Sequence, residues 1–266
     1  MLRLQDVSYT HPNKDVLFCA INLVVNNHEK IALIGNNGTG KSTLLRIIAE
    51  ELQPSAGQLI IDSKPYYVPQ NFGQFDHLTV AQALRIEEKL SALKEILNGN
   101  PNEHNFNTLN EDWTIEERCN EALAYWQLDR VDLTQTLGTL SGGQKAKVFL
   151  AGISIHQAEV ILLDEPGNHL DLSGRRNLYR FVESSKSTMV IVSHDRKLLN
   201  LLETVCELDK HGLHRYGGNH GFYTEQKHIE RNALNDDIQS KEKALRKAKE
   251  KERETVEREQ KLDSRG

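Results

Sequence analysis

The 266-residue sequence predicts an α/β fold that contains a parallel sheet. Two near-continuous apolar runs, residues 160–163 and 189–192, are typical of parallel strands that are covered on both faces. A third short apolar run, residues 31–34, ends at a glycine, and a helical pattern follows it. Strand, helix and strand at this spacing predict βαβ units with right-handed crossovers.

The N-terminal third of the chain predicts strands around one helix. Residues 1–34 predict several strands, and residues 41–52 predict a helix that stops before Pro54. Strand patterns return at residues 59–61 and 66–68. This part of the sequence therefore supplies strands before and after the first helix of the α/β body.

The segment from residue 71 to 139 predicts a helical insertion in that body. A capping box of Thr79 and Gln82 precedes an amphipathic stretch, and Thr114 with Glu117 predicts the cap of a helix that runs to about Leu128. The asparagine-rich residues between them, roughly 98–112, predict a polar loop.

The composition changes at Glu225. Residues 227–266 carry 12 Lys or Arg and 10 Asp or Glu, with almost no large apolar residues, which predicts a solvated helix rather than a core element. This helix is interpreted either as a tail or as a linker arm to another domain. Three i,i+4 pairs support helix formation, namely Glu242–Arg246, Glu254–Arg258 and Glu257–Lys261.

Charge and composition exclude several classes of protein. The net charge of −5 argues against a uniformly basic, nucleic-acid-binding surface. The three cysteines are far apart and form no metal-binding or disulfide pattern, which fits a reducing compartment. No apolar run approaches the ~20 residues of a membrane span, and the N-terminus has no apolar leader. We therefore expect a cytoplasmic location and no direct insertion into a membrane.

Residues 35–42 match the phosphate-loop pattern GxxxxGK[ST], placed between an apolar strand and a helix. The glycines let backbone N–H groups turn toward an anion, and the helix adds its positive N-terminal end. Lys41 is expected to reach the β- and γ-phosphates, and Ser42 to ligate Mg²⁺. The expected nucleotide-binding residues here are Gly35, Asn36, Asn37, Gly38, Thr39, Gly40, Lys41, Ser42 and Thr43.

Two adjacent acids, Asp164 and Glu165, follow the apolar run at residues 160–163. Adjacent carboxylates at the end of a buried strand repel each other unless a cation or solvent relieves them. A phosphate loop needs a second protein ligand for its magnesium, so we expect Asp164 to hold the metal and Glu165 to polarise an attacking water. The alternative is an acid pair exposed to solvent.

Three further elements fit the same site. Gln70 would contact Mg²⁺ or the water, although a lone glutamine is ordinarily a surface residue. His194 follows a buried strand and would reach a γ-phosphate, although a histidine there is often merely packed. Residues 141–144, Ser141, Gly142, Gly143 and Gln144, open a helix with a capping box, and the two glycines also suit close approach to a phosphate.

The motifs together resemble those of an ATP-binding cassette (ABC) domain. In order, they are GNNGTGKS at 35–42, Gln70, LSGGQ at 140–144, VILLDEP at 160–166 and SHD at 193–195, within residues 1 to about 224. The resemblance implies a P-loop NTPase fold of the ABC type with an antiparallel β subdomain and a helical subdomain. It also implies ATP and Mg²⁺ as ligands, and head-to-tail pairing of two cassettes.

In such a pair, the resemblance implies that residues 141–144 act on the partner's nucleotide. It further implies that Glu165 is the general base, with Gln70 and His194 as its catalytic neighbours, and that His194 senses the γ-phosphate. The metal would be held by Ser42, Gln70 and Asp164. The second cassette would lie in the same chain of an intact protein, or in a second copy of this chain.

Residues 168–171, NHLD, and 216–223 resemble segments of the F subfamily (ABC-F), which comprises twin-cassette ATPases without membrane spans, several of which act on ribosomes. In that subfamily a charged linker follows the first cassette, and residues 225–266 are similar to its first half. We therefore interpret residues 1–224 as the first ABC domain and the rest as linker, with ribosome, rRNA or tRNA as expected partners.

Two positions depart from the subfamily pattern. Gly167 stands where a threonine is usual, which loosens the backbone beside Glu165 and bears on how Asp171 is held. The aromatic residue that stacks on adenine aligns with His11 rather than Tyr9, and the sequence does not decide between them.

Three functions are compatible with these motifs. The first is a cytosolic ATPase that uses cassette closure as a switch on the translation machinery. The second is the ATP-binding subunit of a membrane transporter, which the NHLD stretch and the charged helix argue against. The third is a non-enzymatic ATP-dependent dimerisation module, which Glu165 argues against.

Overall fold

The computed structural model describes the backbone of residues 1–263, and the side chains up to residue 249 except those of residues 234, 237 and 248. It consists of two compact units, residues 1–220 and 221–266. The boundary that the sequence predicts after residue 224 stays a prediction. Two of the predicted i,i+4 pairs, Glu254–Arg258 and Glu257–Lys261, lie outside the described side chains.

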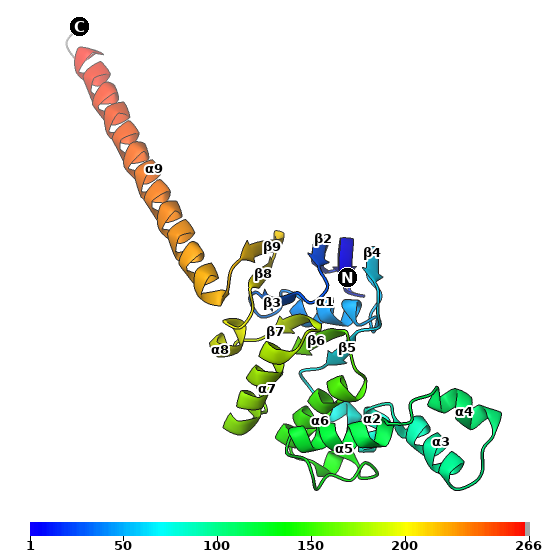
Figure 1. The fold of residues 1–266 in the computed structure, drawn as a ribbon. Coiled ribbons are helices and arrows are strands. Elements are labelled where there is room, and N and C mark those ends of the chain that lie inside the picture. The colour runs from blue at the N-terminus through cyan, green and yellow to red at the C-terminus, as the bar shows by residue number, and fades with distance from the viewer. Residues whose placement is uncertain (264–266) are drawn as a thin grey trace. The chain divides into compact units, whose positions relative to one another are not determined.

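A six-stranded sheet forms the centre of the first unit, in the order β5-β6-β7-β3-β8-β9 (Figure 1). Strands β5, β6, β7, β3 and β8 are parallel, and β9 is antiparallel to β8 at the edge. The bounds are β3 Lys30–Ile34, β5 Tyr66–Val68, β6 Val160–Asp164, β7 Thr188–Val192, β8 Thr204–Asp209 and β9 Gly212–Gly217. Every residue of β6 and β7 is buried, which confirms the parallel strands predicted from the apolar runs.

A second, antiparallel sheet has the order β2-β1-β4, with β1 Leu2–Thr10, β2 Val16–Val25 and β4 Ala56–Ile61. Helix α1, Lys41–Ile48, lies between the two sheets, and Leu44, Leu45, Ile47 and Ile48 join residues of both sheets in one apolar core (Figure 1). The antiparallel subdomain predicted from the resemblance is therefore present.

Helix α1 ends before the predicted residue 52. The chain adopts a left-handed conformation at Glu50, with φ of 59°. The backbone N–H groups of Glu51 and Leu52 both donate to the carbonyl of Arg46, at 2.9 and 3.2 Å. This closing turn satisfies a carbonyl at the end of the helix and stops it ahead of Pro54.

The remaining helices lie in the predicted insertion and after it. Residues 71–139 contain α2 Val80–Ala83, α3 Glu87–Leu97, α4 Glu103–Leu109 and α5 Ile115–Tyr125. Helix α6 Gly142–Ile155 packs on α5 of the insertion, and helices α7 Leu172–Ser184 and α8 Arg196–Leu199 follow strands β6 and β7. Two short 3₁₀ turns cover Gly73–Phe75 and Leu137–Thr139. The capping box of Thr79 and Gln82 is formed as predicted, with both reciprocal hydrogen bonds.

Two local predictions in the insertion are wrong. The predicted loop at 98–112 contains helix α4, because the side chain of Asn102 accepts a hydrogen bond from the backbone N–H of Asn105 and caps it. Thr114 does not cap α5; its hydroxyl instead accepts a hydrogen bond from Arg118 at 2.8 Å. Asparagine richness therefore marks a helix cap here rather than a loop.

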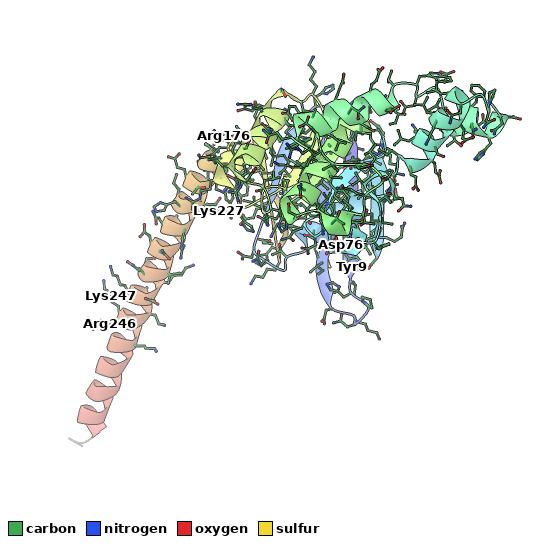
Figure 2. The ribbon with its side chains drawn as sticks, turned by 90° about the horizontal axis from the view of Figure 1, so that it is seen from below. Tyr9, Asp76, Arg176, Lys227, Arg246 and Lys247 are labelled. Atoms are coloured by element: carbon green, nitrogen blue, oxygen red, sulfur yellow. The ribbon has the colours of Figure 1, made fainter. Side chains whose placement is uncertain are left out.

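Helix α9, His220–Asp263, starts at the last residue of the first unit, ahead of Glu225, and makes up the described part of the second unit. Arg246 and Lys247 project outward from it (Figure 2), and most of its described side chains are exposed. The charged composition therefore forms the solvated helix that the sequence predicts. No helix among the described residues is long and apolar enough to cross a membrane.

Asp112 is the most connected acid of the insertion. Its carboxylate pairs with Lys89 at 2.9 Å and Arg118 at 2.7 Å, and its side chain is 15% exposed. Burial alone would raise the pKa of Asp112, but the hydrogen bonds from the two cations outweigh burial and lower it.

We expect Asp112→Asn to lower the free energy of unfolding by about 1–2 kcal/mol at neutral pH. The pKa of Asp112 is lower in the folded protein than in the unfolded chain. Its contribution to the free energy of unfolding is therefore present above the unfolded pKa and is lost as pH falls through the folded pKa. Denaturant unfolding at several pH values measures this, with the exposed Glu116→Gln as the control. A difference between wild type and Asp112→Asn that persists undiminished at acidic pH would contradict it.

Candidate functional site

Four parallel strands end at one edge of the central sheet, and each is followed by a predicted site residue. Strand β3 leads into the phosphate loop, β5 to Gln70, β6 to Asp164 and Glu165, and β7 to His194. Carboxyl ends of parallel strands share an edge, so these segments converge there. A pocket of about 510 Å³ forms at this edge, lined by His11, Leu17, Asn37, Gly38, Gly40, Lys41, Ser42, Thr43, Gln70, Asp164, Glu165, Asn168, Val192 and His194.

The phosphate loop is closed by its own hydrogen bonds. The Lys41 ammonium donates to the carbonyl oxygens of Gly35 and Asn36 at 2.8 and 3.0 Å, and the Thr39 hydroxyl donates to Asn36 at 2.9 Å. Gly35 has φ of 150°, and a Cβ there would lie 2.2 Å from the carbonyl oxygen of Leu208, so only glycine fits. Gly35 and Asn36 line a neighbouring pocket, and Thr39 lines neither.

Asp164 is 2% exposed, at the end of β6. The Tyr67 hydroxyl donates to its Oδ2 at 3.3 Å, whereas its Oδ1 is buried without a hydrogen-bond partner among the described residues. Burial raises the pKa of Asp164, and the nearby hydroxyls of Ser42 and Tyr67 oppose the rise. A buried carboxylate oxygen without a partner, beside the Ser42 hydroxyl, fits a hard divalent cation.

Glu165 is held in an uncommon backbone conformation, with φ of 49°. Its N–H donates to the carbonyl of Val192 at 2.8 Å, which extends the pairing of β6 with β7 by one residue. The side chain is 7% exposed, and burial raises its pKa, an effect that His194 opposes. A left-handed residue other than glycine at a pocket floor is costly and marks a functional position.

His194 contacts Glu165 in two ways. Its backbone N–H donates to Oε2 at 3.3 Å, and its ring Nε2 lies 3.3 Å from Oε1. Oε1 has no partner with hydrogen-bond geometry in the described part of the chain. The histidine ring is 67% exposed, so it stands at the mouth of the pocket while Glu165 lies on its floor.

The structure separates the two aromatic candidates near the N-terminus. His11 is exposed and lines the pocket together with residues of the phosphate loop. Tyr9 packs against Phe18, with ring centroids 6.3 Å apart, and contacts His11 edge to face at 5.4 Å. His11 is therefore the ring that faces the pocket, and Tyr9 supports it from the core side.

Residues 141–144 do not line this pocket. They begin helix α6, where Ser141 and Gln144 form the predicted capping box. A Cβ at Gly143 would lie 2.8 Å from the carbonyl oxygen of His169, whereas one at Gly142 would lie in ordinary contact, 3.5 Å from the His169 ring. The start of α6 is therefore packed against the 168–171 segment, with Ser141, Gly142 and Gln144 exposed.

The segment after Gln70 fastens helix α6 to the sheet. Phe72 and Phe75 both pack on Phe149 of α6, with centroids 5.1 and 5.0 Å apart. The Lys145 ammonium, one residue past the capping box, forms an ion pair at 2.5 Å with Asp76, which is labelled in Figure 2. The pocket wall and the start of α6 are thus linked by direct contacts.

Asp171 forms a helix cap in this chain, in which Gly167 stands at the usual threonine position. The Asp171 side chain caps α7 by accepting a hydrogen bond from the N–H of Gly174 at 2.7 Å, and Lys147 lies 3.7 Å away. The carbonyl of Gly167 accepts a hydrogen bond from Arg175 at 3.2 Å. Nothing lies within 4 Å of a Cβ built at Gly167, and nothing in the structure explains the glycine.

Sequence reasoning missed four residues of this region, namely Tyr67, Leu17, Asn168 and Val192. Asn168 was singled out only for its resemblance to a subfamily segment. Tyr67 pairs with Leu162 in the β5–β6 ladder, so its place near the end of β6 follows from register once the pairing is known. The sequence alone gives no signal for that pairing.

The ABC transporter family profile matches residues 18–168. The Bacillus subtilis protein named Putative ATP-binding protein YdiF is 30% identical over 228 residues, covering 85% of this chain and 32% of that protein. The Tylosin resistance ATP-binding protein TlrC of Streptomyces fradiae is 32% identical, covering 86% and 46%. ABC transporter F family member 2 of Arabidopsis thaliana is 30% identical, covering 79% and 29%. The chain thus spans less than half the length of these curated relatives.

Solved structures share the fold at lower identity. The ATP-binding cassette MJ0796, described as a dimer in a post-hydrolysis state bound to ADP and Pi, superimposes with a TM-score of 0.63 at 22% identity. The match covers 82% of this chain and 98% of that one. An ATP-binding subunit of an ABC transporter gives a TM-score of 0.64 at 21% identity, over 82% and 90%.

Because Gly143 lies closer to His169 than Gly142 does, we predict that an added methyl group is tolerated at Gly142 but not at Gly143. Gly143→Ala forces the His169 carbonyl to move, so we expect it to lower the free energy of unfolding by about 1–3 kcal/mol. Gly142→Ala, the matched control, gains only an ordinary contact. Thermal unfolding of both variants measures this, and equal stabilities would contradict the packing of α6 on residues 168–171.

Proposed function

Because the chain belongs to the ABC transporter family and carries its ATPase cassette, we propose that the pocket at residues 35–42 binds and hydrolyses ATP with Mg²⁺. The observation that carries this proposal is the pair of buried carboxylates, Asp164 and Glu165, at the end of β6 beside the phosphate loop. A pair of adjacent carboxylates is costly there unless a cation balances it, and the Mg²⁺ that accompanies a bound triphosphate would be that cation.

Each residue then takes a role that follows from its place. The loop N–H groups and Lys41 bind the β- and γ-phosphates, and Lys41 exchanges its carbonyl partners for phosphate oxygens. Ser42, Asp164 and Gln70 hold Mg²⁺, which when bound neutralises charge that develops on the phosphate oxygens. His11 stacks on the adenine.

Glu165 acts as the general base. Burial raises its pKa, which strengthens the carboxylate as a proton acceptor while its left-handed backbone fixes its direction. It accepts a proton from the attacking water as the water oxygen bonds to the γ-phosphorus and the bond to the β–γ bridging oxygen breaks. His194, whose ring lies 3.3 Å from Oε1, orients this carboxylate and contacts the γ-phosphate.

A second cassette completes the site. Ser141, Gly142, Gly143 and Gln144 lie outside the pocket, yet they form an exposed, glycine-bearing helix start. Such a terminus suits a phosphate presented by another molecule. We assign these residues to the partner's nucleotide, in a second copy or in another cassette of a longer protein. The dimeric form in which MJ0796 is described supports this arrangement.

The chain resembles the F subfamily, and two Arabidopsis thaliana relatives are named as its members. We propose on this basis a cytoplasmic factor in which ATP-driven closure acts on the ribosome, its RNA or bound tRNA. The charged helix α9 supports a linker role, although its near balance of charges, 12 basic against 10 acidic, does not by itself predict RNA binding.

Substitutions at Lys41 and Glu165 separate binding from hydrolysis. We expect Lys41→Ala to weaken ATP binding about 100-fold, because it removes a charged donor. Glu165→Gln keeps binding and lowers the turnover rate by about 10²–10⁴-fold, because it removes the base. Equilibrium binding of a fluorescent ATP analogue and phosphate release measure the two effects, with the exposed Lys94→Ala as the control. Equal turnover by wild type and Glu165→Gln would reject the assigned base.

Sedimentation with ribosomes tests the proposed target. A protein that carries this chain and a second cassette, with Glu165→Gln, is expected to pellet with ribosomes only when ATP is present, and to remain bound at raised salt. Co-purification with a membrane protein, without such pelleting, would favour the transporter subunit instead. The ATPase assignment does not depend on this outcome.

A further inference from the structure

A second cavity lies far from the nucleotide pocket, on the helical insertion. It has a volume of about 590 Å³ and is lined by Phe106, Asn107, Asn110, Glu111 and Trp113, which we call the α4 groove. Helices α3 and α4 lie side by side at the end of the insertion away from the central sheet (Figure 1). The groove therefore belongs to neither the pocket nor the exposed start of α6.

Two aromatic rings form the apolar part of the α4 groove. Phe106 is 45% exposed and Trp113 is 48% exposed. Their ring centroids are 6.2 Å apart, with the ring planes at 64°. Single exposed apolar residues are normal on a protein surface, but two large rings in contact, in one cavity, mark an interaction site.

The backbone that carries Trp113 is firmly anchored. Its neighbours Asp112 and Thr114 both accept hydrogen bonds from Arg118, at 2.9 and 2.8 Å, and Arg118 also donates to the carbonyl of Ile155 on α6. Lys89 of α3 binds Asp112 from the other side. An exposed ring on an anchored backbone loses little conformational freedom when a partner binds.

The polar groups of the α4 groove are available to a ligand. Within the described residues, the carboxylate of Glu111 forms no hydrogen bond or ion pair, and the side-chain amides of Asn107 and Asn110 form no hydrogen bond. Asn110 and Glu111 both adopt left-handed conformations, with φ of 49° and 60°. Asn110 is the left-handed C-cap of α4, a conformation that suits asparagine, and Glu111 continues the turn that presents its carboxylate at the groove.

The charge around the α4 groove selects the partner. Residues 87–113 contain six Asp or Glu and two Lys, a net charge of −4, which becomes −3 when Arg118, the second partner of Asp112, is counted. A phosphate backbone is repelled by this surface, whereas a cationic side chain is attracted to it and is also stabilised over an indole ring.

We propose that the α4 groove binds a basic, extended segment of a protein partner. An Arg or Lys side chain of that segment lies over Trp113 and pairs with Glu111, and the amides of Asn107 and Asn110 hydrogen-bond to its backbone. This inference is independent of the proposed ATPase and ribosome roles, because no residue of the nucleotide pocket takes part.

Intrinsic fluorescence tests the proposal directly. The chain has two tryptophans, and Trp126 is fully buried, so a ligand that covers the α4 groove changes mainly the emission of Trp113. The probes are the octapeptide (Arg-Leu)₄, its acidic counterpart (Glu-Leu)₄ and a 12-nucleotide single-stranded RNA, each titrated into the whole chain. We expect the basic peptide alone to change the emission in a saturable way.

Calorimetry with variants locates the binding. Trp113→Ala and Glu111→Gln are each expected to weaken binding of the basic peptide at least ~10-fold. Val16→Ala, which alters an apolar residue that is 60% exposed on β2, is expected to leave it unchanged. The rate of ATP hydrolysis should be the same in all three variants, which separates this test from that of the pocket.

Three results would overturn the proposal. The first is the absence of saturable binding by the basic peptide. The second is binding of RNA that displaces the peptide and depends on Trp113, since the partner would then be a nucleic acid. The third is equal peptide affinity of wild type, Trp113→Ala and Glu111→Gln, since the attraction would then be a general effect of the acidic surface.

Discussion

The burial of two adjacent carboxylates at the end of one strand is the constraint on which the site depends. Asp164 and Glu165 are 2% and 7% exposed, and burial raises the pKa of each. Two such carboxylates are tolerable only beside strong positive charge. The parallel sheet brings them to the phosphate loop, because β3 and β6 end at the same edge of the sheet. The left-handed backbone of Glu165 shows that this placement carries a local cost.

Helix α6 is held against the segment that leaves the pocket edge of the central sheet. Phe72 and Phe75 pack on Phe149, and Asp76 pairs with Lys145, so the chain that leaves Gln70 holds the helix that begins at Ser141. The segment after Glu165 meets the start of that helix at Gly143. Direct contacts therefore run from the segments that follow Gln70 and Glu165 to the exposed start of α6, which does not line the pocket. The fold thus joins an internal nucleotide pocket to an external helix terminus.

Contiguous motifs were the part of this structure that the sequence could predict. The phosphate loop and the acids after β6 work through local backbone geometry, and the parallel strand order then brings Gln70 and His194 to them. Contacts between distant segments could not be predicted from the sequence, because they depend on tertiary packing. Examples are the hydrogen bond from Tyr67 to Asp164 and the fact that His11, rather than Tyr9, lines the pocket. Helix α4 was missed because the side chain of Asn102 caps it, where the sequence pattern indicated a loop. The cap by Thr114 was wrong because its hydroxyl bonds to Arg118 instead of a backbone N–H group.

The most direct test of the central claim is a crystal structure of the Glu165→Gln protein with ATP and Mg²⁺. The account predicts a triphosphate enclosed by the N–H groups of residues 35–42, a metal ion bound by Ser42 and Asp164, and Ser141 of a second cassette on the γ-phosphate. A triphosphate bound elsewhere, or a metal ion that does not contact Asp164, would contradict it.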